Sequence, residues 1–169
     1  MSYVPTDPRL GLQPIANTDT TQRHALGTRI RANDPVYGDG EFIYLKGVAS
    51  TVVGSVVTYD GASSGTPTYQ TALAPATANL GQPLAVAMSA NVANQYGWYQ
   101  IAGSAVVATN GTLAAGPGKV YLAGSGQLTS TAGAGLQVLS ARNDTATGTP
   151  AANQAVVQID RPSAQGQIT

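Results

Sequence analysis

The chain of 169 residues contains no cysteine and only one histidine, His24. Zinc sites, redox-active pairs and thiol nucleophiles need one or both of these residue types, usually several of them together. Their scarcity excludes these kinds of chemistry, so we expect no metal site, no cofactor and no cysteine-based catalysis.

Charged side chains are also scarce. They make up 9% of the chain, with 8 basic and 8 acidic residues, whereas soluble proteins usually carry about 25%. Binding to nucleic acid relies on clustered Lys and Arg, and the sequence has no such cluster, so we expect no nucleic-acid partner. A surface with so few ions is kept in solution by uncharged polar groups, which indicates that partners cover much of it.

Long apolar runs are missing as well. No stretch approaches the roughly 20 apolar residues of a membrane-spanning helix, so we expect no membrane association. The first residues, MSYVPTDPRLGLQP, lack the basic start and apolar run of a secretion signal. We therefore expect the mature chain to begin at Met1 or Ser2.

The few charges are concentrated near the N-terminus. Ten of the 16 charged residues lie within 1–46, and Lys119 is the only one between residues 61 and 141. The first part of the chain shows no helical periodicity, and its prolines disfavour regular helix. These prolines are Pro5, Pro8, Pro14 and Pro35. We predict that residues 1–36 form an extended arm, with a disordered tail as the alternative.

The rest of the chain reads as β-strands. Short β-branched and aromatic runs alternate there with clusters of Gly, Pro, Asn and Ser. The predicted strands are 40–47, 50–60, 83–90, 96–109, 118–124, 136–142 and 153–160. They predict an all-β fold, a jelly-roll-like sandwich or barrel, with a body over 37–162 and a short tail over 163–169. We expect 71–80 to form a loop or a single turn, and 123–136 a hairpin loop.

The only Trp lies in the stretch QYGWYQ, residues 95–100. Side chains alternate along a strand, so Tyr96 and Trp98 point one way while Tyr99 and Ile101 point the other. A strand that is apolar on both faces is normally covered on both, which indicates a core or a subunit interface. We assign that role to Phe42, Tyr44, Tyr96, Trp98, Tyr99 and Ile101. The alternative is a sugar-stacking platform, with Asn91, Asn94 and Gln95 available for the hydroxyl groups.

Three short motifs resemble catalytic or phosphate-binding sites only weakly. GASSG at 61–65 fits the G-x-S-x-G pattern of a serine hydrolase, but the only His precedes the serine. Asp39 and Glu41 could share a strand face like the paired carboxylates of glycosidases, although acidic residues here more simply shape a turn. AAGPGKVY lacks the spacing of a phosphate loop and the Ser or Thr that should follow Lys119. We therefore expect no catalytic residues and do not predict an enzyme.

Two stretches, YGDGEFIYLKG (37–47) and QYGWYQ (95–100), together with the polar N-terminal segment, resemble capsid cement proteins of tailed bacteriophages. The likeness covers most of the chain, although 61–83 and 161–169 are less distinctive. It implies a β-rich body on the outer surface of an icosahedral shell, with extended arms that clamp neighbouring capsomers. The implied partner is the major capsid protein, and the implied location is the virion, after synthesis in the host cytoplasm.

The resemblance suggests that the N-terminal segment acts as a staple. An extended arm of about 35 residues could reach roughly 100 Å, and its backbone could add a strand to an exposed capsid sheet edge. Several copies, most simply a homotrimer, would strengthen weak contacts by acting together. The expected capsid-binding residues are Arg9, Leu10, Leu12, Ile15, Arg23, Arg29 and Arg31. Deleting 1–36 should then leave a folded body that cannot bind shells.

Two other classes of function stay open at this point. A tail-fibre or receptor-binding module that recognises host-surface glycans would need exposed Trp98 and Tyr99 rings. A hydrolase built on Asp39 and Glu41 would show measurable turnover. Either observation would favour its own class over the cement protein.

Overall fold

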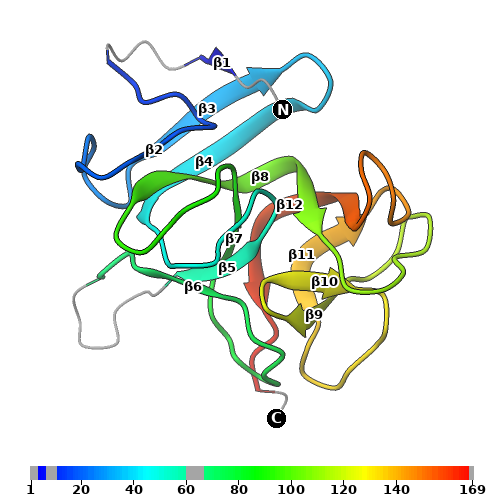
Figure 1. Ribbon diagram of the computed structural model, residues 1–169. Helices are drawn as coiled ribbons and strands as arrows, with labels where there is room; N and C mark the ends of the chain where they lie inside the picture. Colours follow the sequence, from blue (N-terminus) through cyan, green and yellow to red (C-terminus); the bar gives the residue numbers. More distant parts are fainter. Residues whose placement is uncertain (1–3, 7–10, 60–66, 168–169) are drawn as a thin grey trace.

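The all-β prediction is confirmed by a computed structural model, which describes residues 4–6, 11–59 and 67–167 (Figure 1). These residues contain strands and no helix, and so no helix long and apolar enough to cross a membrane. The strands are β1 (Val4–Pro5), β2 (Thr18–Asp19), β3 (Arg29–Asp34), β4 (Gly38–Lys46), β5 (Val56–Tyr59), β6 (Thr71–Leu73), β7 (Leu84–Ala87), β8 (Tyr96–Ala108), β9 (Tyr121–Gly124), β10 (Gln127–Thr129), β11 (Val138–Asn143) and β12 (Gln154–Ala164).

Each of the seven predicted strands overlaps a strand of the structure, namely β4, β5, β7, β8, β9, β11 and β12. The sequence reasoning missed the remaining five. β6 lies inside the predicted loop 71–80, and β10 lies inside the expected hairpin loop 123–136. β3 has the sequence RIRAND and alternates exposed and buried residues along its length, which is the period-two pattern of a half-buried strand.

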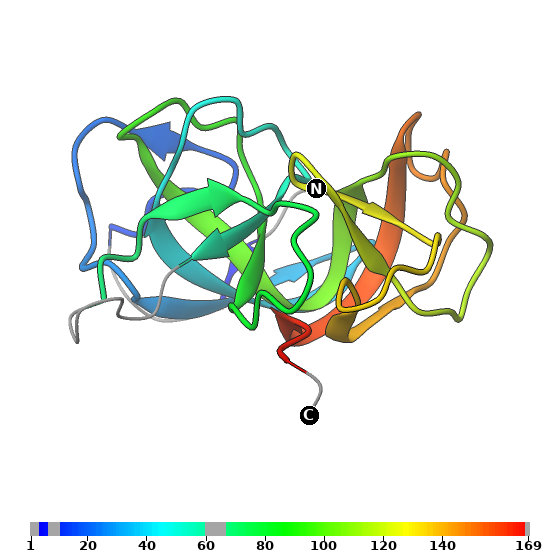
Figure 2. The same ribbon diagram turned by 90° about the horizontal axis from the view of Figure 1, so that it is seen from below.

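The larger sheet is antiparallel, and the 13-residue strand β8 is its centre. The first part of β8 pairs with β4, β7 and β2, and the part from Ala102 to Ala108 pairs with β12, which in turn pairs with β11. Figure 2 shows the result, an N-terminal half and a C-terminal half that lie side by side and share β8. β9 and β10 form a separate two-stranded sheet in the C-terminal half.

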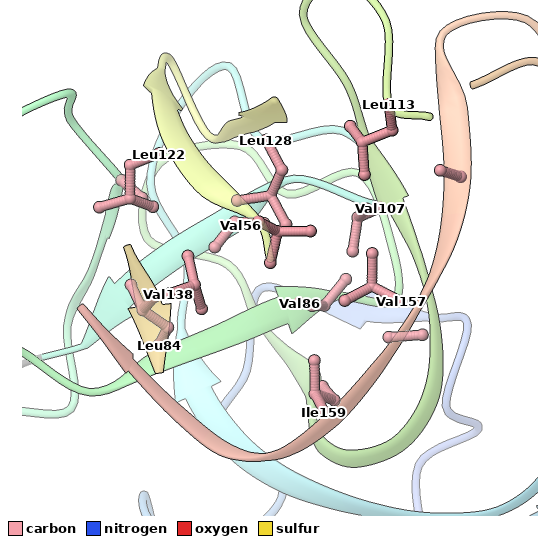
Figure 3. Packing of buried hydrophobic residues seen from close by; sticks show 14 of the residues in the cluster. Val56, Leu84, Val86, Val107, Leu113, Leu122, Leu128, Val138, Val157 and Ile159 are labelled. Atoms are coloured by element: carbon pink, nitrogen blue, oxygen red, sulfur yellow. The ribbon is translucent and has the colours of Figure 1, made fainter. Parts of the chain in front are cut away.

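The buried hydrophobic residues form three clusters, and the two faces of a central strand contribute to different clusters. The aromatic core consists of Ile15, Ile30, Ala32, Phe42, Tyr44, Met88 and Trp98. The central core consists of Ile43, Leu45, Val57, Ala85, Ala87, Tyr99 and Ile101. The aliphatic core is built from Val, Leu, Ile and Ala, and Figure 3 shows its side chains gathered between the strands, among them Val56, Leu84, Val107, Leu122 and Val157.

This layering explains why the run FIYL is apolar throughout and why WYQI contains a single polar residue, Gln100. In β4, Phe42 and Tyr44 face the aromatic core while Ile43 and Leu45 face the central core. β5 and β7 alternate in the same way between the central and the aliphatic cores. The strands β4, β8, β7, β5 and β6 pair in that order. A β-bridge between Lys46 of β4 and Gln70, the residue before β6, connects the first of these strands to the last, so the five strands close around the central core.

The predicted extended arm is not confirmed, because residues 11–36 lie against the body. β3 pairs with β4 along its whole length, and Ile15 and Ile30 are each only 3% exposed within the aromatic core. Among the prolines that suggested an arm, Pro14 and Pro35 stand between strands, and Pro5 lies within β1. Pro8 lies outside the described residues. Pro14 accepts the turn hydrogen bond of Asn17, and Pro35 begins the turn between β3 and β4.

Candidate interaction surface

The aromatic stretch of β8 is buried inside the chain. Trp98 and Tyr99 have no solvent exposure, and they point into the aromatic and the central core respectively. The indole Nε1 of Trp98 donates to the carbonyl oxygen of Gln13 at 2.9 Å, and the amide of Asn91 donates to the hydroxyl of Tyr99. Neither ring can therefore stack on a sugar in this structure.

The residues expected to bind a capsid from an arm divide into three groups. Arg9 and Leu10 lie outside the described residues. Leu12 and Ile15 pack on or within the aromatic core, so they are occupied inside the chain. Arg23 pairs with Asp19 at 2.6 Å, whereas Arg29 and Arg31 project from the exposed face of β3.

Glu41 lies between two arginines that come from opposite ends of the chain. Its carboxylate accepts hydrogen bonds from Arg31 at 3.4 Å and from Arg161 at 2.9 Å. The strand register produces this arrangement, because Glu41 pairs with Arg31 on one side and with Ala102 of β8 on the other, and Ala102 pairs with Asp160 of β12. The side chains of Arg31 and Arg161 stay 77% and 59% exposed, so each also faces solvent.

A third arginine, Arg29, lies near Tyr59, which packs against the central core. Burial raises the pKa of the Tyr59 hydroxyl, and the positive charges of Arg29 and Arg161 act against that rise. Both guanidinium groups therefore lie within electrostatic reach of the same phenol. We call Arg29, Arg31 and Arg161 the arginine cluster. Glu41 bonds to two of these arginines, and the carboxylates of Asp39 and Asp160 line the adjoining groove, so the formal charges of these six residues cancel.

A groove of about 560 Å³ runs beside the arginine cluster. Its floor is made by the small residues Gly40, Ala102 and Gly103, and its walls include Arg31, Asp39, Glu41, Asp160 and Arg161. A second hollow of about 490 Å³ shares Asp160 with it and continues over the C-terminal half, past Arg142. Most of the charged residues in the body thus line one open surface that crosses β3, β4, β8, β12 and β11.

Gly103 makes the floor of the groove, and no other residue fits its conformation. Its φ angle is +101°, and an added Cβ would lie 2.3 Å from the carbonyl oxygen of Asp39. The close approach occurs where β8 leaves β4 and joins β12. The glycine therefore allows one strand to serve both halves of the molecule.

The carboxylates of Asp39 and Glu41 both have partners. Both residues line the groove, but Asp39 accepts a hydrogen bond from Asn33 at 2.8 Å and Glu41 is the partner of two arginines. All five residues of GASSG, 61–65, lie outside the described residues. In the described part of the chain, no group of three His, Asp or Glu side chains could hold a metal ion.

The exposed arginine side chains of the cluster suit recognition of carboxylate groups on a partner. Arginine presents a planar set of donors that matches carboxylate oxygens, and it keeps its charge under all ordinary conditions. Sequence reasoning selected Arg29 and Arg31 but missed Arg161, which stands 120 residues from Glu41. No protein family matches this chain, and no curated protein or solved structure matches it either.

Proposed function

We propose that this protein is a structural virion protein, a capsid cement protein that binds the outer surface of an icosahedral phage shell and stabilises it. The two stretches that carry the resemblance, YGDGEFIYLKG and QYGWYQ, form the paired strands β4 and β8. The resemblance therefore concerns the strands that separate the aromatic and central cores. This supports a shared fold, whereas the contact with a shell needs an argument from the surface.

The observation that carries the proposal is the arginine cluster on one open face of a nearly uncharged body. Ion pairs on a broad protein surface are weak one by one, but several together steer and orient a partner. In our proposal the major capsid protein supplies acidic side chains that meet Arg29, Arg31 and Arg161. The contact is made by the folded body and does not need a 36-residue arm. Several copies around one symmetry axis, most simply a homotrimer, would raise the effective concentration of each contact.

Co-sedimentation with undecorated, expanded capsids tests this proposal. We expect saturable binding by the wild-type chain, and at least about a tenfold weaker affinity after Arg29→Gln, Arg31→Gln and Arg161→Gln are combined. The matched control removes the same amount of positive charge outside the arginine cluster, through Lys46→Gln, Lys119→Gln and Arg142→Gln, and should bind like the wild type. Absence of binding by a folded wild-type chain, or equal binding by both variants, would contradict the proposal.

The glycan-binding alternative receives no support from the described surface. It requires Trp98 and Tyr99 to be exposed, and both are buried. Asn91, which was expected to help with sugar hydroxyls, is 1% exposed and bonded to Tyr99.

A further inference from the structure

The single histidine of the chain takes part in a hydrogen bond that fixes its protonation state. The backbone N–H of Gln13 donates to Nε2 of His24 at 3.2 Å. A backbone amide nitrogen has no free lone pair and can only donate, so Nε2 must offer its lone pair. The imidazole is therefore neutral in this arrangement and carries its proton on Nδ1.

The same Gln13 attaches the segment 11–19, which we call the strap, to the two central strands. Its carbonyl oxygen accepts from Trp98, and its side-chain oxygen accepts from the hydroxyl of Tyr44 at 2.8 Å. Its side-chain amide donates to Asn17 within the strap and to the carbonyl oxygen of Tyr96. A movement of the main chain at Gln13 would therefore disturb the contacts of the strap with both β4 and β8.

The ring of His24 lies within this network rather than beside it. Its centroid is 5.1 Å from that of Tyr44, in an edge-to-face arrangement, and 5.4 Å from that of Trp98. A positive charge on the imidazole can interact favourably with aromatic faces, so these contacts alone would not release the strap. The hydrogen bond from Gln13 is the contact that protonation removes, because it would then place two N–H groups against each other.

The other charged and titratable groups around this site keep their state as His24 titrates. Asp19 accepts from the backbone of Thr21 and pairs with Arg23, and these interactions hold its pKa below the ordinary value, so it stays ionised. Tyr44 on β4 has its pKa raised by burial, so it stays neutral. The ring of Tyr96 on β8 stacks against that of Tyr44, with the ring centroids 6.4 Å apart. Among these groups only the imidazole ordinarily titrates between about pH 5 and 8.

We infer that His24 is an acid-sensitive latch, which holds the strap against β4 and β8 while its imidazole is neutral and releases the strap when the imidazole is protonated. In the closed form, in which the strap lies against β4 and β8, Nε2 accepts the hydrogen bond of Gln13 and cannot carry a proton. In the open form, in which the strap is released, Nε2 can be protonated. Acid therefore favours the open form, and the closed form gains as pH rises through the histidine range near about 6.5. The inference does not depend on the capsid proposal.

Amide hydrogen exchange in the full-length protein tests the latch. The protection of the Gln13 amide is measured between pH 7.5 and 5.5, corrected for the intrinsic effect of pH on exchange. The internal reference is the amide of Leu122, which donates to Leu136 at 2.9 Å in the C-terminal half. We expect the protection at Gln13 to fall about tenfold relative to Leu122, as for the loss of one hydrogen bond.

The variant His24→Gln separates the latch from a general effect of acid, because a glutamine can offer an acceptor oxygen but does not titrate. In this variant we expect the protection at Gln13 to be independent of pH over the same range. Equal pH dependence in wild type and variant, or a wild-type Gln13 that follows Leu122 throughout, would overturn the latch. If the variant does not fold, ¹⁵N NMR of wild-type His24 decides, since an Nε2 that carries a proton at pH 7.5 contradicts the inference.

Discussion

The aromatic core and the aliphatic core hold their parts of the molecule together in different ways. The aromatic core contains 7 buried side chains, and its Tyr and Trp are tied by hydrogen bonds to Gln13 of the strap. The aliphatic core contains 15 buried side chains, none of them aromatic or polar. The aliphatic core is stabilised by many small apolar contacts, whereas the aromatic core depends on a few hydrogen bonds between segments that are distant in sequence. Single changes should therefore have larger effects around the aromatic core.

The largest expected effect is that of deleting residues 1–36. Sequence reasoning predicts a folded body after this deletion, but the structure leads to the opposite expectation. The deletion removes β3 and the buried Ile15, Ile30 and Ala32, and it uncovers Trp98. We expect loss of the cooperative thermal transition, measured by circular dichroism. Deletion of 1–6, which removes only the two-residue strand β1, should keep that transition, and a cooperative 1–36 deletion would contradict the layered account.

The next effect concerns the glycine at the junction of the two halves. Gly103→Ala combines a positive φ angle with a Cβ that would lie 2.3 Å from the oxygen of Asp39. We expect a loss of at least about 3 kcal/mol in the free energy of unfolding. Gly38→Ala is the matched control, since its φ is +73° and nothing lies within 4 Å of an added Cβ. It should cost about 1 kcal/mol in urea titration, and equal losses would show that the close approach is unimportant.

Substitution of one glutamine in each region compares their hydrogen-bond contributions to the free energy of unfolding directly. Gln13 is 7% exposed, and its side chain bonds to Tyr44, Asn17 and Tyr96. Gln127 in the C-terminal half makes one long side-chain hydrogen bond, to Thr109 at 3.4 Å. We expect Gln13→Ala to lower the free energy of unfolding by about 2 kcal/mol and Gln127→Ala by less than about 0.5 kcal/mol. Similar losses in chemical denaturation would remove the contrast between the regions.

The smallest expected effect is a loss of stability in alkali that comes from the central core. Burial raises the pKa of Tyr99 to about 12, although Asn91 donates a hydrogen bond to its hydroxyl. The folded state therefore keeps this phenol neutral when the unfolded chain ionises near pH 10, so stability is complete below that pH and falls as pH rises toward 12. Between pH 9 and 11 the loss should be about 1.4 kcal/mol.

Tyr99→Phe isolates this contribution. Burial also raises the pKa values of Tyr44 and Tyr59, so the wild type should lose further stability in the same direction. The variant should show a weaker pH dependence of its denaturation midpoint than the wild type between pH 9 and 11. An identical dependence in both proteins would mean that Tyr99 ionises without penalty.

The sequence predicts those strands whose side-chain pattern indicates which faces are buried. In WYQI, residues 98–101, only Gln100 is polar, and this pattern predicts that β8 is covered on both faces. In FIYL, Phe42 and Tyr44 predict that β4 contributes to a core or an interface. The first four residues of β3, RIRA, alternate charged with uncharged residues, which is a strand pattern, but the neighbouring prolines favour an arm. Pro14 and Pro35 fall at turns, and Ile15 fills a core that the arm interpretation did not allow for it.

The arginine cluster could be predicted only in part. Arg29 and Arg31 stand on one strand at a spacing of two, so their common face follows from the alternation of a strand. Arg161 reaches Glu41 because β12 joins β8 at the position where β4 leaves it, and this register depends on the conformation of Gly103. No local pattern around residue 161 contains that information.

The central claim is that the arginine cluster makes the contact with the shell, and the salt dependence of binding tests it most directly. The affinity of wild-type protein for undecorated capsids should fall steeply as salt is raised, because exposed ion pairs are screened. The variant without Arg29, Arg31 and Arg161 should bind weakly and with little salt dependence, while the variant without Lys46, Lys119 and Arg142 should follow the wild type. Wild-type binding that is tight and indifferent to salt would contradict the claim.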